Sequence, residues 1–487
     1  MMRSPIASGF LVILCSAVFH SAFAIGGVDT APAPSAPHEV TFSQAREIKL
    51  ENGLRVVVVE RPGLPILAAE IVVRNGAEVD PDQLAGVATM TGSLLIMGTE
   101  TMSAPQIASA MESLGGSIDS GAHWDASHAT MVVMSDKAEP ALRILADVVM
   151  HPTFKQEEID RLKNQTLDGL RVALRQPGSL GQFVTIRAIF GTGEYGHAPG
   201  GTMESIQAIQ REDIVKVYQT YYRPENAALV LSGNLTLEQG RKYAEQFFGG
   251  WKSSGQPAAE PASHAEKMQL KPTNIVVDMP EAGQAMVILA KPAIKRSSPD
   301  YYAGTVANAA LGNGFISRLN QEIRIKRGLS YGARSALDAR RAVGPFMAWA
   351  QTKNESAGEV AALIQSELKR VHTEPVQGEE LVSRQAVLTG GFARSLETNN
   401  GYVNKVASLI TQDLPLDTLN TFVPSVNAVT AKDVSAFAEK YFETPPSLVI
   451  VGKAPTFLEG VKKNFQDVRL IPLPELDLNR PELVKKK

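Results

Sequence analysis

The sequence predicts an α+β fold made of two homologous domains, each a mixed or antiparallel sheet covered by helices. An internal repeat and a repeated order of strands followed by helices predict it. The first half ends "SIQAIQREDIVKVYQTYYRPENAALVLSGN" and the second "SVNAVTAKDVSAFAEKYFETPPSLVIVGK". Five positions recur in both segments: Ser205, Ala208, Asp213, Tyr221 and Gly233 correspond to Ser425, Ala428, Asp433, Tyr441 and Gly452. We also expect the two domains to face each other across a cavity, an arrangement that the periodicity of the sequence does not itself indicate.

The chain begins with a segment typical of a secretory signal peptide. Arg3 precedes the apolar run "GFLVILCSAVFHSAFA", which ends in an A-x-A pattern, so cleavage is expected near Ala24-Ile25. A membrane anchor is the alternative, but the run is short and contains His20. Cys15 is the only cysteine and lies in the removed segment, so the mature chain has no disulfide or thiolate site. We therefore expect a periplasmic protein.

Two stretches of biased composition set the expected domain boundaries. A Pro/Ala-rich spacer at residues 25–44 follows the signal peptide at residues 1–24. A linker at residues 252–271 then separates an N-terminal domain, residues 45–251, from a C-terminal domain, residues 272–478.

Each domain opens with strands and continues with helices. Strands rich in β-branched residues are expected at 54–60, 67–76 and 227–233 in the first domain, and at 274–279, 284–291 and 447–452 in the second. Long amphipathic helices are expected at residues 157–174 and 379–396. A helix is expected before the last strand of each domain. Its N-terminus carries a pattern that resembles Ser/Thr-x-x-Asp/Glu, which is typical of a helix start.

The segment "GVATMTGSLLIMGT", residues 86–99, combines an apolar stripe with a face of small side chains. The apolar residues recur at helical spacing and predict burial: Val87, Met90, Leu94 and Met97. Thr89, Gly92 and Ser93 share another face, at the spacing with which a zinc peptidase directs two histidines and a glutamate at one metal. In place of the two histidines and the glutamate, this chain has the hydroxyl groups of Thr89 and Ser93 and the hydrogen atom of Gly92.

The chain resembles the pitrilysin/insulinase family of zinc peptidases, the inverzincins, which includes the mitochondrial processing peptidase. The resemblance extends from "IKLENGLRVVVVERPGLPILAAEIVVRNGAEVD" to "LIPLPELDLNRPEL", nearly the whole mature chain. Between them, "GHAPGGTMESIQAIQREDIVKVYQTYYRPENAALVLSGN" and "LGNGFISRLNQEIRIKRGLSYGARS" match in the same order. It implies a two-domain clamshell half that helps to enclose an unfolded peptide.

In that family an H-x-x-E-H motif holds zinc, and this chain departs from it at every position. The two histidine ligands fall on Thr89 and Ser93, and the catalytic glutamate on Gly92. A third ligand, a glutamate, falls on Gly169, and a supporting glutamate on Leu162. Zinc needs about three imidazole or carboxylate ligands, and Gly92 cannot take a proton from water. We expect no cofactor bound by this chain and close packing of the two helices through their small residues.

Other histidines offer no replacement ligands. His123 and His128 are five residues apart in an expected strand, so alternation sends their side chains to opposite faces. His151 and His197 are expected to be structural.

A second element of the family, an Arg and a Tyr seven residues apart, is intact as Arg324 and Tyr331 in "RIKRGLSY". The resemblance implies that Tyr331 donates its O–H to the substrate carbonyl or the developing oxyanion, while Arg324 holds a substrate carbonyl. Spacing alone also fits a surface arginine and a tyrosine packed on the core. The preceding Gly312 and Gly314 form either a substrate-side loop or an unusual turn.

The resemblance therefore implies a non-catalytic subunit of a hetero-oligomeric zinc peptidase. Its partner would be a homologous H-x-x-E-H subunit that holds the zinc, and Arg324 and Tyr331 would complete the partner's site. An inactive peptide-binding or structural homologue, as a homodimer or within a larger assembly, is one alternative; an enzyme with relocated ligands is another. The net charge of −3 indicates neither a nucleic acid nor an anionic membrane as partner.

Overall fold

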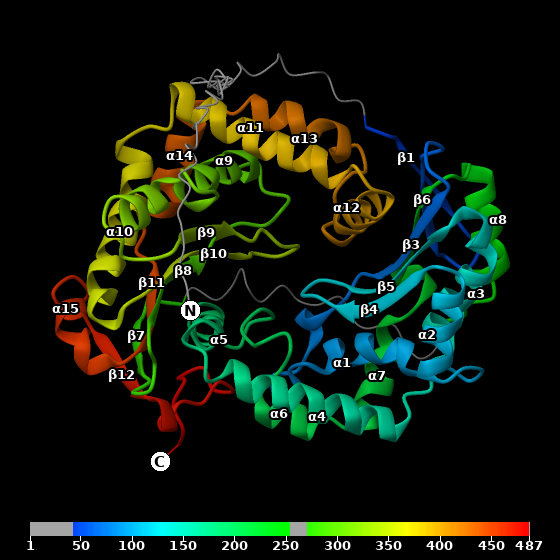
Figure 1. The fold of residues 1–487 in the computed structure, drawn as a ribbon, viewed down its shortest axis with the longest axis horizontal. Helices are drawn as coiled ribbons and strands as arrows, with labels where there is room; N and C mark the ends of the chain where they lie inside the picture. The colour runs from blue at the N-terminus through cyan, green and yellow to red at the C-terminus, as the bar shows by residue number, and fades with distance from the viewer. Residues whose placement is uncertain (1–41, 254–269, 487) are drawn as a thin grey trace, which may run out of the picture. The chain divides into compact units, whose positions relative to one another are not determined.

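The described residues form two six-stranded sheets, one in each half of the chain (Figure 1). The computed structural model describes residues 42–253 and 270–486, which belong to one unit of the fold. The expected signal peptide, the spacer up to residue 41 and linker residues 254–269 lie outside the described residues.

The N-terminal sheet has the strand order β1-β2-β6-β3-β5-β4. Its strands are β1 (Ala45–Lys49), β2 (Arg55–Glu60), β3 (Ile66–Val73), β4 (Ser117–Ala122), β5 (Ser127–Met134) and β6 (Ala227–Gly233). Strands β2 and β6 run parallel, and the other neighbouring pairs of the described sheet are antiparallel. The sheet is therefore mixed, as the sequence predicts.

The C-terminal sheet, β12-β7-β11-β8-β10-β9, repeats this arrangement. Its strands are β7 (Asn274–Asp278), β8 (Ala285–Pro292), β9 (Ala333–Leu337), β10 (Pro345–Thr352), β11 (Ser447–Gly452) and β12 (Val468–Pro472). The edge strands differ: β12, from the end of the chain, runs parallel to β7, whereas β1 runs antiparallel to β2. The predicted repeat and the α+β class are confirmed.

Helices surround both sheets. The first half contains α1 (Val87–Leu94), α2 (Ala104–Ser113), α3 (Ala138–Met150), α4 (Gln156–Ala173), α5 (Pro177–Phe190), α6 (Met203–Ala208), α7 (Arg211–Tyr221) and α8 (Leu237–Phe248). The second contains α9 (Tyr301–Gly312), α10 (Ala357–Thr373), α11 (Gly378–Ser395), α12 (Asn399–Thr411), α13 (Thr418–Asn427), α14 (Ala431–Phe442) and α15 (Leu458–Lys462). The predicted helices at 157–174 and 379–396 are α4 and α11, within one residue at each end. No helix in the described parts of the chain is both long and apolar enough to cross a membrane.

The helices before the closing strands begin as their sequences predict. Thr430 and Asp433 at the start of α14 form a reciprocal capping box, and at the start of α7 the Asp213 carboxylate accepts a hydrogen bond of 2.8 Å from the backbone N–H of Gln210. In such a box, side chains satisfy backbone N–H groups of the first turn that have no partner within the helix.

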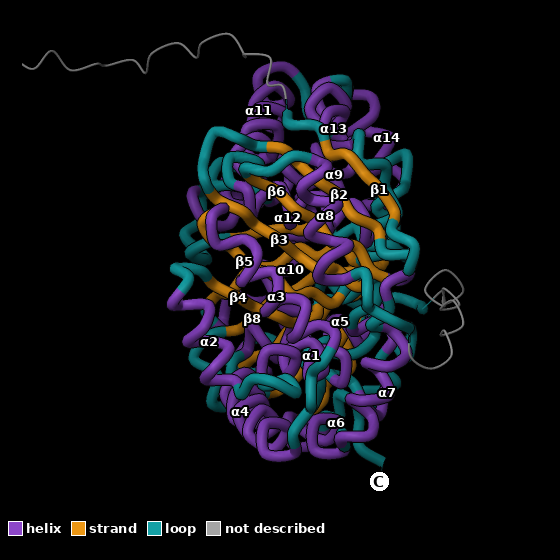
Figure 2. The backbone as a smooth tube through the Cα atoms, turned by 90° about the vertical axis from the view of Figure 1, so that its right-hand side faces the viewer, coloured by secondary structure: helices purple, strands orange, loops and turns teal. Residues whose placement is uncertain are grey.

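Each sheet is covered on one face by helices of its own half and on the other face by a helix of the other half. Helices α1, α3 and α8 lie over one face of the N-terminal sheet, as Figure 2 shows, and α12 packs on β3 and β6 from the opposite side. Helix α5 of the first half packs in the same way on β8 and β11. The halves thus exchange one helix each and share their hydrophobic cores.

The two cores follow from the alternation of side chains along a strand. In β3, alternate residues Leu67, Ala69, Ile71 and Val73 pack in the core beneath α1 and α3. Ala68 and Val72 point the other way, into the core that contains α12. Glu70 lies between these two residues and interrupts the apolar α12 face.

Candidate functional site

Helix α1, where the family's zinc motif falls, is a packed element of the fold. Val87, Met90 and Leu94 are buried in the core, as predicted, and Met97 is partly buried in the following 3₁₀ turn. The Thr89 hydroxyl donates a hydrogen bond of 2.7 Å to the carbonyl of Pro199. This hydroxyl thus serves the contact between α1 and a neighbouring loop.

Gly92 is required by a close backbone contact. A Cβ atom on Gly92 would lie 2.5 Å from the carbonyl carbon and 2.6 Å from the oxygen of Gly121, in strand β4. We expected the small residues to let α1 pack closely on the helix that carries Gly169; the two helices, α1 and α4, are neighbours, but Gly169 takes no part in their contact. Gly169 is exposed on α4, where an added Cβ would meet no described atom within 4 Å, and the half-buried Leu162 lies on the same helix. The neighbour that excludes a side chain from position 92 is a strand.

The five positions of the zinc motif do not fit a zinc ion. Gly92 and Gly169 have no donor atom, Leu162 is aliphatic, and neutral hydroxyls of Thr89 and Ser93 are poor ligands beside imidazole. Within residues 42–253 and 270–486, no three His, Cys, Asp or Glu side chains are arranged to hold a metal ion. That the chain works without a cofactor of its own stays a prediction.

Arg324 and Tyr331 lie on a surface of the second half. Arg324 belongs to a short π-helical turn, Asn320–Ile325, and its guanidinium lies 4.6 Å from the centroid of the Phe315 ring. Tyr331 precedes β9 and is 92% exposed, which contradicts the alternative of a tyrosine packed on the core. Both side chains are accessible from outside this chain, and their roles stay predictions.

The two glycines before this turn differ in their surroundings. Gly312 ends α9, where a Cβ atom would lie 2.3 Å from the backbone nitrogen of Ser335, so it allows α9 to pack on β9. Gly314 is exposed and has φ +111°, a conformation that favours glycine. Gly312 therefore serves packing, and Gly314 serves an exposed turn beside Phe315.

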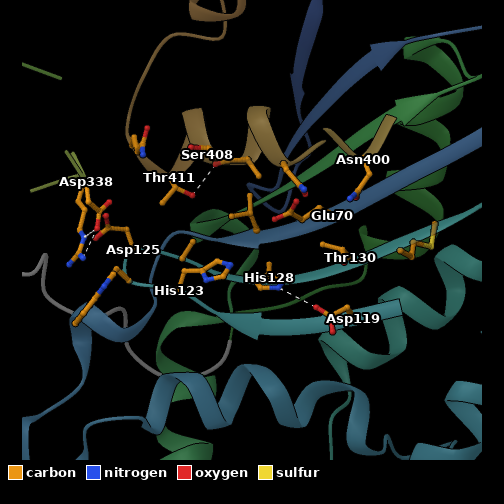
Figure 3. A pocket seen from close by; sticks show the side chains of 18 of the residues that line it. Glu70, Asp119, His123, Asp125, His128, Thr130, Asp338, Asn400, Ser408 and Thr411 are labelled. Carbon is orange, nitrogen blue, oxygen red and sulfur yellow. Dashed lines mark hydrogen bonds and ion pairs between the residues drawn. The ribbon is translucent and has the colours of Figure 1, made fainter. Parts of the chain in front are cut away.

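A cavity of about 700 Å³ lies between the inner face of the N-terminal sheet, helix α12 and residues 338–340 (Figure 3). Both halves of the chain supply its walls, as expected for two domains that face each other. Glu70 and Thr130 come from the sheet, and Asn400 and Ser408 come from α12.

Two histidines of this cavity lie against each other. The rings of His123 and His128 stack with centroids 5.0 Å apart and an interplanar angle of 19°. The prediction of opposite faces was wrong, because a hairpin turn between β4 and β5 reverses the chain between them. His128 Nε2 lies 3.6 Å from Asp119 Oδ2, while burial and the neighbouring His123 lower the pKa of His128. The buried His197 lies 3.7 Å from Asp80, whose carboxylate accepts hydrogen bonds from the first turn of α1.

Glu70 is the residue of this cavity that the sequence reasoning missed. Its side chain is only 6% exposed, and Oε2 has no hydrogen-bond partner among the described residues. Burial raises the pKa of Glu70 to about 8. The signal was present as a single acidic residue inside the apolar run "ILAAEIVV", because a buried charge without a partner is costly.

Replacing Glu70 with glutamine is expected to make the protein more stable at alkaline pH. The pKa of Glu70 is raised in the folded state, so its favourable contribution is complete at low pH and is lost as pH rises from about 4.5 through about 8. Relative to wild type, Glu70→Gln should gain roughly 4 kcal/mol in the free energy of unfolding between pH 5 and pH 9. Urea unfolding at both pH values measures this gain, with the exposed Glu439→Gln as control. An equal difference at both pH values would contradict it.

Comparison with known proteins places this fold in a family. The family model described as "Insulinase (Peptidase family M16)" matches residues 55–179, and the model described as "Peptidase M16 inactive domain" matches residues 208–388. Together these matches span more than half of the chain. The chain belongs to the M16 family of peptidases, and its residues 208–388 match the domain that is described as inactive.

Individual relatives cover most of the chain. The Bacillus subtilis protein named "Uncharacterized zinc protease YmxG" is 23% identical over 82% of this chain and 96% of its own length. The Helicobacter pylori protein named "Non-peptidase homolog YmxG" is 23% identical over 80% of this chain and 89% of its own length. A crystal structure titled as a peptidase M16 inactive domain from Pseudomonas fluorescens is 28% identical, with a TM-score of 0.77, and covers 84% of this chain and 97% of that one.

Proposed function

We propose that this protein is the non-catalytic subunit of a hetero-oligomeric zinc peptidase of the periplasm. The observation that carries the proposal is the contrast between two surfaces of one chain. Helix α1 offers no metal ligands at the motif positions, whereas Arg324 and the fully accessible Tyr331 remain at the family's second element. The match to the inactive-type M16 domain includes both residues and supports pairing with a homologous peptidase subunit.

In the pair, the partner's H-x-x-E-H helix would hold the zinc ion that activates water. Tyr331 would donate its O–H to the carbonyl oxygen of an unfolded peptide substrate, where negative charge develops. Arg324 would donate to a substrate backbone carbonyl, and its contact with the Phe315 ring limits the orientations of its guanidinium. Donors placed where charge develops contribute about 3 kcal/mol each, because they need no rearrangement during the reaction.

Substitution of these donors is expected to lower the activity of the reconstituted pair. The isolated chain should hydrolyse no peptide, and addition of an exported H-x-x-E-H relative should give activity. Tyr331→Phe and Arg324→Ala should each reduce kcat/KM about 100-fold. The controls are Tyr243→Phe on α8 and the exposed Arg143→Ala on α3, which should leave peptide hydrolysis unchanged.

Two outcomes would contradict this function. Full activity of a pair that carries both Tyr331→Phe and Arg324→Ala would refute the role of these residues. Chelator-sensitive hydrolysis by the purified chain alone would refute the non-catalytic role and favour an enzyme with relocated ligands.

An inactive peptide-binding or structural homologue is the second candidate. It is favoured by the likeness to the Helicobacter pylori protein named as a non-peptidase homologue. This candidate predicts a stable homodimer, or a member of a larger assembly, that ignores an H-x-x-E-H relative. Light scattering of the chain with and without that relative separates the two candidates.

A further inference from the structure

The cavity under α12 has more acidic than basic side chains in its wall. Three of its carboxylates have partners within the chain. Asp338 accepts two hydrogen bonds from Arg340, at 2.8 and 2.6 Å, and Asp119 lies beside His128. Asp125 accepts from the Tyr195 hydroxyl at 2.5 Å and from the backbone N–H of Arg341 at 3.1 Å. In contrast, Oε2 of Glu70 has no partner in the part of the chain that the structure describes.

The internal repeat shows that the fold does not need an acid at this position. Glu70 of β3 pairs with Val230 of β6, three residues before Gly233. In the second half, Ile288 of β8 pairs with Val449 of β11, three residues before Gly452. Ile288 is fully buried beneath α5, at the place where Glu70 lies beneath α12. The same architecture accepts an aliphatic side chain there, so the carboxyl group of Glu70 has a use other than packing.

We propose that this cavity binds the ammonium group of an alkylamine, either a lysine side chain of a peptide or a free diamine, as an ion pair with Glu70. A cationic donor gives the buried carboxylate the partner that the chain itself does not supply. Its volume of about 700 Å³ suits a ligand of several residues or an extended diamine.

Polar neighbours of Glu70 complete the site. Thr130 is its direct cross-strand neighbour in the β3–β5 pair, which places the two side chains on one face. Asn400 and Ser408 face the same space from α12, toward which Glu70 points (Figure 3). An ammonium group has three N–H donors, so beside the carboxylate it can bond the Thr130 hydroxyl and one of the two α12 side chains, which lie about two helical turns apart. An anionic ligand would meet an excess of carboxylates, so the site selects for cations.

Amine binding is coupled to the release of a proton. Burial keeps the pKa of Glu70 near 8, so at pH 7 the free carboxyl group is mostly protonated and must ionise to pair with the amine. The other titratable or charged groups that face the cavity are Asp119, His123, Asp125, His128, Asp338 and Arg340. Burial and His123 hold the pKa of His128 low, so this imidazole is largely neutral at pH 7. Binding at pH 7 should therefore release roughly one proton, and affinity should increase from pH 6 to pH 8.

Calorimetry of the isolated full chain tests the site without any partner subunit. The probes are 1,5-diaminopentane and the peptide acetyl-Ala-Lys-Ala-amide. The uncharged control is the same peptide with norleucine in place of lysine, called the norleucine peptide. Titrations in buffers of different ionisation enthalpy count the protons released. Glu70→Gln and Glu70→Ile, the latter copying the second half, should each weaken amine binding at least 10-fold and abolish proton release. The exposed Glu439→Gln on α14 should bind as wild type does.

Binding by the lysine peptide only would identify a peptide side chain as the ligand, and binding by the diamine only would identify a free amine. Absence of binding by both probes would overturn the proposal. It would also be overturned if folded Glu70→Gln or Glu70→Ile bound the amine with the affinity of wild type. Equal binding of the norleucine peptide would exclude recognition of the ammonium group.

Discussion

Replacement of Gly92 by alanine is expected to destabilise the protein by roughly 3 kcal/mol or more. The added Cβ would lie 2.5 Å from the carbonyl carbon of Gly121, which is backbone of strand β4 and cannot move as a flexible side chain does. Helix α1 would have to separate from β4 and disturb the core beneath Val87 and Met90. Urea unfolding of Gly92→Ala against wild type measures the loss.

Gly169→Ala is the matched control. It makes the same substitution at another position of the degenerate zinc motif, but its expected effect on the free energy of unfolding is opposite. Gly169 is exposed within α4, and an added Cβ would meet no described atom within 4 Å. Alanine stabilises a helix interior relative to glycine by about 1 kcal/mol, so this variant should be slightly more stable. A Gly92→Ala protein that unfolds at the wild-type midpoint would contradict the close contact with β4.

The same contact bears on whether the peptidase motif can be restored. A glutamate at position 92 has the Cβ atom for which the structure leaves no space. Substitution of the motif residues alone would therefore disturb the fold before it supplied ligands. The present α1 is adapted to its position against β4.

Neither half of the chain is expected to fold without the other. Residues 42–253 alone would leave Ala68, Val72 and Val230 without the cover of α12. Residues 270–487 alone would leave Met286, Ile288 and Val449 without α5. Exposure of buried aliphatic side chains costs roughly 1.5–3 kcal/mol each, so the loss is comparable with the whole stability of a domain.

Coexpression of the two halves, with an affinity tag on one of them, measures this dependence. We expect each half alone to aggregate or to unfold without cooperativity, and the coexpressed halves to copurify. Cleavage of the folded chain within residues 254–269 serves as control, because the exchanged helices should keep the two products together. A soluble, cooperatively unfolding half would show that the exchange of α5 and α12 is dispensable.

Elements set by local pattern were predictable from the sequence. Strands β6 and β11 occupy the predicted residues 227–233 and 447–452, since a short apolar run suits a strand buried on both faces. The capping interactions of α7 and α14 were visible because they join residues three positions apart. The apolar stripe of α1 followed from its helical spacing.

The sequence by itself determined the repeat, the class of fold and the absence of zinc ligands at the motif positions, because these depend on residue identity and short-range order. Only the tertiary structure decided which segments meet. It places Gly92 on β4 instead of α4, stacks His123 on His128 across a hairpin, and exchanges α5 and α12 between the halves. It also leaves Glu70 buried beneath α12 with an unpaired oxygen, while the repeat places Ile288 beneath α5. The physical reason is that burial and pairing depend on residues far apart along the chain, which no local period specifies.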